Sequence, residues 1–198
     1  MNYARSVHQV ARDLVGATLR HGGAAGRIVE VESYHQEEPA CHAFIGPRPR
    51  TEVLFGPPGH AYVYRSYGIH ALLNAVAEDD GVGAAVLIRA IEPLDGIELM
   101  RTRRGGVRDD ELTNGPGKLT EALDIGLELN GASLEDGPIR IEPRDPAARP
   151  PEIVTGTRIG ITKAADLPWR FCDATSRWVS RPWPVAMRRA TRSRARAA

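Results

Sequence analysis

The chain has 198 residues, of which 42% are hydrophobic and 26% charged, with a formal net charge of +1. This composition is typical of a folded globular protein and excludes disordered, collagen-like and fibrous classes. A chain of this length forms one domain, or at most two small ones, and buries enough surface to fold without a disulfide or a structural metal.

The first residues, MNYARSVHQVARDLVGATL, interleave charges with apolar side chains and lack the continuous apolar core of a signal peptide. No apolar run reaches the roughly 18 residues that a membrane span needs. The two cysteines, Cys41 and Cys172, match no paired spacing, so we expect reduced thiols. These features predict a cytoplasmic protein that is neither secreted nor bound to a membrane.

In chain order, apolar spacing predicts an amphipathic helix from Val7 to Leu19, ended by Gly22 and Gly23. The next segment, RIVEVESY, alternates like a strand. HAYVYRSY and IHALLNAVA predict two strands of a hairpin hinged at Gly68. AAVLIRAI is almost continuously apolar, which is typical of a central strand covered on both faces.

Two more helices are expected, from Asp95 to about Arg104 and through KLTEAL, followed by strand-like pieces in PIRIEP, TRIGIT and FCDATSRWVS. The order of helix, strands, helices and strands predicts a single mixed α+β domain. We place this domain at residues 1–184. Residues 185–198 form an arginine-rich tail without an acid, expected to be disordered, which either touches a polyanion or has no particular role.

Several common catalytic motifs are absent from the sequence. NGPGKL resembles a phosphate loop, but Leu112 stands where its first glycine would be and Leu119 where Ser or Thr is required. No HExxH, zinc-spaced cysteine pair, GxSxG elbow or GxGxxG turn occurs. We therefore expect no metal site and no cofactor.

The strand predicted in RIVEVESY carries the first candidate for chemistry. Its alternation puts Glu30, Glu32 and Tyr34 on one face. One interpretation is an edge strand with a solvated face. The other is a pocket wall in which an aromatic ring lies beside a general base, since acids are depleted in strands.

The predicted hairpin concentrates aromatic side chains. Tyr62 and Tyr64 share a face of its first strand, whereas Tyr67 is out of phase with them and belongs at the tip beside Gly68. An aromatic ring at an exposed tip has no obvious core role but suits stacking on or between nucleic-acid bases.

A series of longer blocks resembles the alkyladenine (3-methyladenine) DNA glycosylase family across roughly residues 10–182. The blocks follow the order of the family, with short gaps, and are GRIVEVESY, ACHAF, PRTEVLFGPPGHAYVY, YGIHALLNAV, VLIRAIEPLDGIELMRTRR and LTNGPGKLTEAL. The resemblance implies a curved antiparallel sheet flanked by helices, no metal, and a monofunctional mechanism without a Schiff base. It also implies excision of alkylated purines such as 3-methyladenine and 7-methylguanine, and in some members hypoxanthine.

The resemblance further implies roles for individual residues. Glu32 matches the carboxylate that deprotonates the attacking water, and Glu30 is a weaker candidate for that role. Tyr67 matches the wedge that fills the gap left in the duplex by a flipped nucleotide. The matching base-pocket residues are Tyr34, His42, Tyr64, Asn74 and Arg89.

Contacts with the DNA backbone are expected from four basic residues. Lys118 matches a phosphate contact of the family, whereas Arg104 at a helix end and Arg48 and Arg50 in the loop after His42 are candidates by position alone. Solvated surface charge is the alternative for Arg104.

The resulting prediction is a base-excision repair glycosylase whose partner is double-stranded DNA that contains damaged purines. A monomer suffices for this mechanism, and no obligate protein partner is needed. Three alternatives stay open: a non-catalytic nucleic-acid-binding domain of the same fold, a lyase that uses Lys118 as a Schiff-base amine, and a hydrolase of free nucleosides. The preferred lesion is not specified by these residues.

Overall fold

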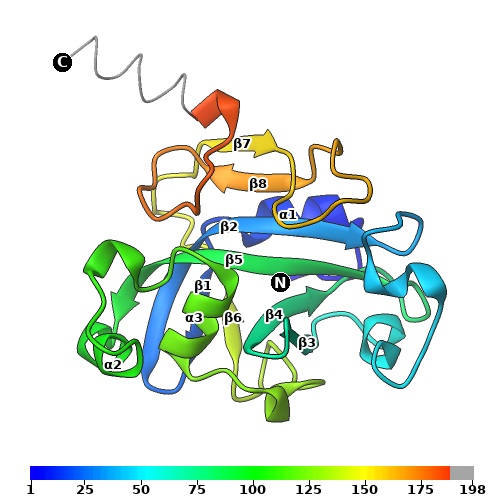
Figure 1. Ribbon diagram of the computed structural model, residues 1–198, viewed down its shortest axis with the longest axis horizontal. Coiled ribbons are helices and arrows are strands. Elements are labelled where there is room, and N and C mark those ends of the chain that lie inside the picture. The colour runs from blue at the N-terminus through cyan, green and yellow to red at the C-terminus, as the bar shows by residue number, and fades with distance from the viewer. Residues whose placement is uncertain (188–198) are drawn as a thin grey trace.

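Eight antiparallel strands form one curved sheet in a computed structural model that describes residues 1–187 (Figure 1). The arginine-rich tail from Arg188 onward lies outside the described residues. The strands are β1 (Thr18–His21), β2 (Ala24–His35), β3 (Ala61–Ser66), β4 (His70–Val76), β5 (Ala84–Asp95), β6 (Arg140–Glu142), β7 (Ile153–Gly156) and β8 (Arg170–Asp173). The α-helices are α1 (Val7–Leu14), α2 (Ile97–Arg103) and α3 (Pro116–Leu123), and the 3-10 helices are η1 (His42–Ile45), η2 (Glu52–Phe55), η3 (Asp109–Glu111) and η4 (Leu127–Leu129).

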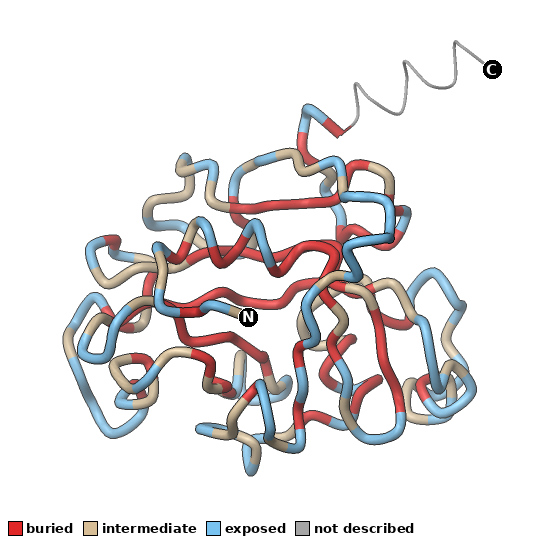
Figure 2. Tube along the Cα trace, turned by 180° about the vertical axis from the view of Figure 1, so that it is seen from behind, coloured by how far each residue is buried: buried red, intermediate tan, exposed pale blue. Residues whose placement is uncertain are grey.

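The two longest strands, β2 and β5, pair along almost their whole length and form the spine of the sheet. The strand order is β3-β4-β5-β2-β1-β6, and β8 joins β2 beyond β1 and carries β7 on its other edge. Buried residues run along β2 and β5 in Figure 2, because strands or helices cover both of their sides. The predicted α+β class with a curved antiparallel sheet is confirmed.

The burial of β2 decides between the two interpretations of its acidic face. Glu30 and Glu32 are both 0% exposed. β5 pairs with β2 on one side, and β8 pairs with its residues 30–32 on the other. The interpretation as a solvated edge strand is therefore wrong, and both carboxyl groups lie inside the protein.

The first helix is shorter than its apolar spacing predicts. It ends at Leu14, and Gly16, with a φ of 96°, turns the chain into β1. Leu19 belongs to that strand, where it pairs with Gly26 and Ile141. Apolar spacing failed here because a buried strand follows the helix after only three residues and continues its run of core side chains.

Two later segments also differ from the expected strands. TRIGIT lies in the loop after β7, and β8 ends at Asp173, so most of FCDATSRWVS is not a strand. The loop keeps Arg158 buried through ion pairing, which hydrophobic alternation does not detect. The expected helices at α2 and α3 and the central strand β5 are confirmed.

The predicted hairpin is present as β3 and β4, joined by Tyr67, Gly68 and Ile69. Tyr67 has a φ of 50° and is 87% exposed, and Ile69 is 72% exposed. A bulky residue with positive φ is rare and strained, so a role outside packing is indicated for Tyr67.

The described chain continues past the boundary expected at residue 184. Met187 is 2% exposed and packs in the main hydrophobic core. The division into residues 1–184 and 185–198 stays a prediction. Within residues 1–187, no helix is long and apolar enough to cross a membrane.

Candidate active site

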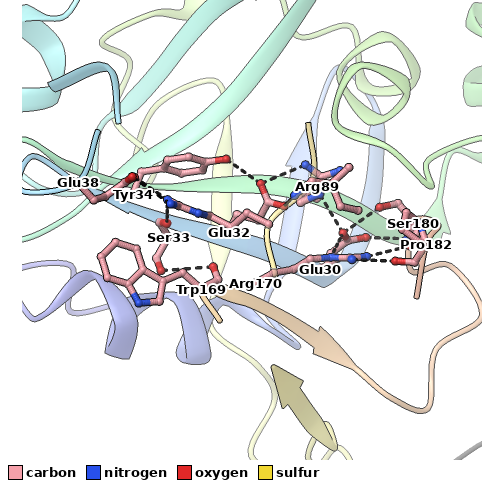
Figure 3. Close-up of polar contacts among 12 residues, drawn as sticks. Glu30, Glu32, Ser33, Tyr34, Glu38, Arg89, Trp169, Arg170, Ser180 and Pro182 are labelled. Atoms are coloured by element: carbon pink, nitrogen blue, oxygen red, sulfur yellow. Dashed lines mark hydrogen bonds and ion pairs between the residues drawn. The ribbon is translucent and has the colours of Figure 1, made fainter. Parts of the chain in front are cut away.

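The carboxyl group of Glu32 has donors on both of its oxygens (Figure 3). Oε2 accepts a hydrogen bond from the hydroxyl of Tyr34 at 2.8 Å and from Nη1 of Arg89 at 3.1 Å. Oε1 accepts one from the backbone N–H of Ile159 at 2.7 Å. These donors come from β2, from β5 and from the loop before β8, so the fold of the whole sheet positions this carboxylate.

Arg89 joins this carboxylate to Glu30. Its Nε donates to Oε1 of Glu30 at 2.9 Å, and Nε of Arg170 donates to the same oxygen at 2.7 Å. Glu30 also accepts from the backbone N–H of Ser180 at 2.6 Å and from the Ser180 hydroxyl at 2.8 Å. Glu30 thus has four donors, three on Oε1 and one on Oε2, and is built as a structural anchor, whereas Glu32 has three donors, of which only one is on Oε1.

The two acids and two arginines of this cluster balance in formal charge, and all four residues are buried. Burial raises the pKa of Glu32, and the Arg89 guanidinium, the Ile159 amide and the Tyr34 hydroxyl oppose that rise. Burial and the neighbouring Glu32 raise the pKa of Tyr34, so its hydroxyl stays protonated and donates. A carboxylate with a raised pKa behind a cavity wall is a candidate general base.

A cavity of about 770 Å³ lies in front of the cluster. Tyr34, Arg89 and Ile159, the three partners of Glu32, all line it, while Glu32 is held behind them. The tip of the β3–β4 hairpin and the start of α3 also line the cavity. Tyr67 both lines the cavity and is 87% exposed, so the hairpin places it at the cavity mouth.

Aromatic rings form one wall of the cavity. His42 packs edge-on against Tyr64, with ring centroids 4.6 Å apart, and its Nδ1 lies 3.1 Å from the hydroxyl oxygen of Tyr62. Tyr62 and Tyr64 stack at 5.4 Å. Burial lowers the pKa of His42, so its ring is neutral near pH 7.

The remaining expected pocket residue, Asn74, also lines the cavity and is 5% exposed. Its side-chain N–H donates to the backbone oxygen of Tyr62 at 3.1 Å, which orients its amide within the sheet. The structure thus brings together all the residues predicted for the base pocket, Tyr34, His42, Tyr64, Asn74 and Arg89.

The four expected backbone contacts fall in different places. Arg50, Arg104 and Lys118 line the cavity. Arg104 pairs with Glu121, and Lys118 Nζ donates to Asn114 Oδ1 at 2.8 Å. Arg48 is exposed and does not line the cavity, so the structure does not join it to the other three.

Four residues of the site escaped the sequence analysis. Arg170 and Ser180 contact Glu30 of β2, and Arg158 contacts Glu38 just after β2, all from more than a hundred positions later in the chain. Ile159 contributes only its backbone N–H. No local pattern marks such partners. The available signal was the pair of acids in a strand-like segment, because acids that become buried require partners.

Among residues 1–187, no group of three or more His, Cys, Asp or Glu side chains is arranged to hold a metal ion. Cys41 and Cys172 are both buried, free thiols. Burial raises the pKa of both, to about 11 for Cys41. Neither thiol is an activated nucleophile.

Comparison with known proteins identifies the class. The family model for methylpurine-DNA glycosylase matches residues 1–177. A protein of Rhodopseudomonas palustris is 56% identical over 182 residues, which are 92% of this chain and 87% of the relative. A protein of Methanoculleus marisnigri is 52% identical, over 90% of this chain and 96% of the relative. Both carry the name "Putative 3-methyladenine DNA glycosylase".

These matches define a DNA glycosylase, an enzyme of base-excision repair that hydrolyses N-glycosidic bonds. The chain belongs to the methylpurine-DNA glycosylase family. Its substrate is therefore DNA, and the resemblance seen in the sequence blocks is confirmed.

Proposed function

We propose that this protein rotates an alkylated or deaminated purine out of duplex DNA into the 770 Å³ cavity and hydrolyses its N-glycosidic bond with a water that Glu32 deprotonates. The observation that carries the proposal is the position of Glu32, held by three donors directly behind the cavity wall. The proposed substrates are 3-methyladenine, 7-methylguanine and hypoxanthine.

Glu32 has two tasks in this mechanism. Oε1 has one bound donor and about one free acceptor site, which suits a water poised to attack C1′. The negative charge also stabilises the positive charge that develops on the sugar as the base departs. Since 3- and 7-alkylated purines already carry a positive charge, one carboxylate suffices for them.

The cavity walls select a flat ring. Tyr34, His42 and Tyr64 offer ring faces and edges against which a flipped purine stacks, and a neutral His42 does not repel a cationic base. Asn74 is proposed to disfavour guanine through a clash with its exocyclic amine. Arg89 orients Glu32 and approaches the nucleotide at the same time.

Outside the cavity, Tyr67 is proposed to enter the duplex and replace the flipped nucleotide in the stack. Its exposure and its place at the cavity mouth support this role. Arg50, Arg104 and Lys118, which line the cavity, and the exposed Arg48 are proposed to contact phosphates. A single glycosylase domain at residues 1–184, acting as a monomer, suffices for all of these contacts.

The test is base release from duplexes that contain 7-methylguanine or hypoxanthine. We expect the free base and an intact abasic site, with no covalent adduct after borohydride treatment. A trapped adduct lost in Lys118→Gln would instead indicate a lyase. Release from free modified nucleosides at the duplex rate would indicate a nucleoside hydrolase, and lesion binding without any release would contradict catalysis on these lesions.

A further inference from the structure

Arg158 is the most completely enclosed charged residue of the loop between β7 and β8, with a side chain that is 0% exposed. Its Nη1 donates to Oε1 of Glu38 at 2.5 Å and its Nη2 to Oε2 at 3.0 Å, a bidentate pair. It also donates to the backbone oxygens of Ser33 at 3.2 Å and Ala164 at 3.2 Å. These bonds fasten the loop to the end of β2.

The same guanidinium lies between two aromatic rings. It sits 4.6 Å from the ring centroid of Tyr34 and 5.1 Å from that of Trp169. The ring of Trp169 in turn packs against His8, with centroids 4.5 Å apart and ring planes tilted by 57°. These contacts connect α1 to Tyr34, which lines the cavity, and Figure 3 shows Tyr34 and Trp169 on either side of Ser33 and its contacts.

Arg158 does not line the cavity, whereas Tyr34 does, so the guanidinium supports the Tyr34 ring from behind. The residue that follows Arg158 is Ile159, whose N–H donates to Oε1 of Glu32. The hydroxyl of Tyr34 donates to Oε2 of the same carboxylate. One side chain therefore anchors both of the uncharged donors to Glu32.

We propose that Arg158 is a positioning residue of this active site: it fixes the Tyr34 ring and the Ile159 amide, and through them the orientation of the Glu32 carboxylate. The inference rests on the proposed function of Glu32. Stacking on the back of Tyr34 also holds the ring flat for the purine that would lie on its front face.

Loss of the Arg158 contacts also affects the ionisation of Glu32. The two uncharged donors stabilise the carboxylate form, so their displacement raises the pKa of Glu32. The other titratable or charged groups that act on it are Glu30 on the same strand, Tyr64 from β3, Arg89 from β5 and Cys172 from β8. None of them contacts Arg158 through an ion pair, so a variant at residue 158 leaves them in place.

The experiment compares Arg158→Lys with a matched control, Arg27→Lys. Lysine keeps a positive charge beside Glu38 but has no plane to stack and cannot reproduce the bidentate fork. Arg27 also lies at the sheet, pairs with Glu92 and Asp173, and does not line the cavity. Single-turnover release of 7-methylguanine is measured from pH 4 to pH 9, after subtraction of uncatalysed release, together with thermal unfolding of each variant.

We expect Arg158→Lys to lower the maximal rate by about 10- to 100-fold, as small misplacements of catalytic groups do. The acidic limb of its pH–rate profile moves to higher pH, while its affinity for the lesion duplex falls by a smaller factor than the rate. Arg27→Lys keeps the maximal rate and the acidic limb of the wild type. A folded Arg158→Lys variant with the wild-type rate and acidic limb would overturn the inference.

Glu38→Gln supplies a second variant if lysine prevents folding, because it weakens the anchor but leaves Arg158 in the stack. The same direction of shift is expected, and an unmoved limb would again overturn the inference. Glu32→Gln separates the two claims: if that variant still releases base, the proposed function fails. If it is inactive while the residue 158 and 38 variants behave as wild type, only the inference about Arg158 fails.

Discussion

Glu32 must be ionised to take a proton from water, so its pKa sets the lower pH limit of catalysis. Burial raises that pKa above its ordinary value of 4.5, more than the surrounding donors lower it. Since only the ionised carboxylate acts as a base, activity is full above the pKa of Glu32 and is lost as the pH falls through that pKa. We expect the acidic limb of single-turnover base release to lie above pH 4.5. A rate that stays constant down to pH 4.5 would contradict this assignment.

Glu30 should matter to stability as much as Glu32 matters to chemistry. Glu30→Gln leaves Arg170 and Arg89 buried with one carboxylate fewer, and breaking a buried pair costs about 3–5 kcal/mol. We expect urea denaturation to show that the free energy of unfolding of Glu30→Gln is lower than that of the wild type by an amount in this range. The matched control is Glu92→Gln, whose partner Arg27 and own side chain are about a third exposed, and which should cost about 1 kcal/mol or less. Equal losses in the two variants would contradict the anchor role of Glu30.

Two acids in an otherwise apolar strand marked Glu30 and Glu32 as candidates, but the local pattern left a solvated edge strand open, and only the family resemblance singled out Glu32. Its partners were not predictable from such local patterns. Arg170 and Ile159 reach Glu30 and Glu32 only after the chain has folded back over more than a hundred residues. Resemblance to a family located the pocket residues, whereas Arg158 became visible only through its contacts.

The β3–β4 hairpin carries a conformation that stability alone does not favour. Tyr67→Gly removes a bulky side chain from a position with a φ of 50°, where glycine is unstrained. We expect the free energy of unfolding to change by about 0.5 kcal/mol or less. Base release from duplex DNA should fall about tenfold or more, because one aromatic stack is worth about 1–3 kcal/mol.

The control for the hairpin is Leu127→Ala, which truncates another partly exposed apolar side chain outside the cavity. It should leave base release from duplex DNA unchanged. An active Tyr67→Gly variant would exclude the wedge role and leave the strained turn unexplained.

Secondary structure was predictable where one element buries one regular face. In β5, the segment from Ala84 to Ile91 is apolar apart from Arg89, and all of it is buried, as its nearly continuous apolar sequence predicts. The prediction failed at Leu19, where helix and strand share one apolar run, and at TRIGIT, where a buried ion pair replaces apolar contacts. In both places tertiary contacts, and not local periodicity, decide the backbone.

For the molecule as a whole, a net charge of +1 provides little general attraction to DNA, so binding must depend on local basic residues. The logarithm of the binding constant should fall linearly with the logarithm of salt concentration, by about 0.9 for each phosphate contact. Lys118→Gln should reduce that slope by about 1. Arg149→Gln, at an exposed arginine away from the cavity, should leave it unchanged. A slope near zero for the wild type would contradict the proposed phosphate contacts.

The most direct test of the account is single-turnover release of 7-methylguanine by Glu32→Gln beside the wild type and Glu92→Gln. Glutamine keeps the size of the side chain but cannot accept the proton of the attacking water. We expect Glu32→Gln to bind the lesion duplex while its release rate falls by about 10²- to 10⁴-fold, and Glu92→Gln to behave as the wild type. Release by Glu32→Gln at close to the wild-type rate would contradict the central claim that this buried carboxylate activates the water.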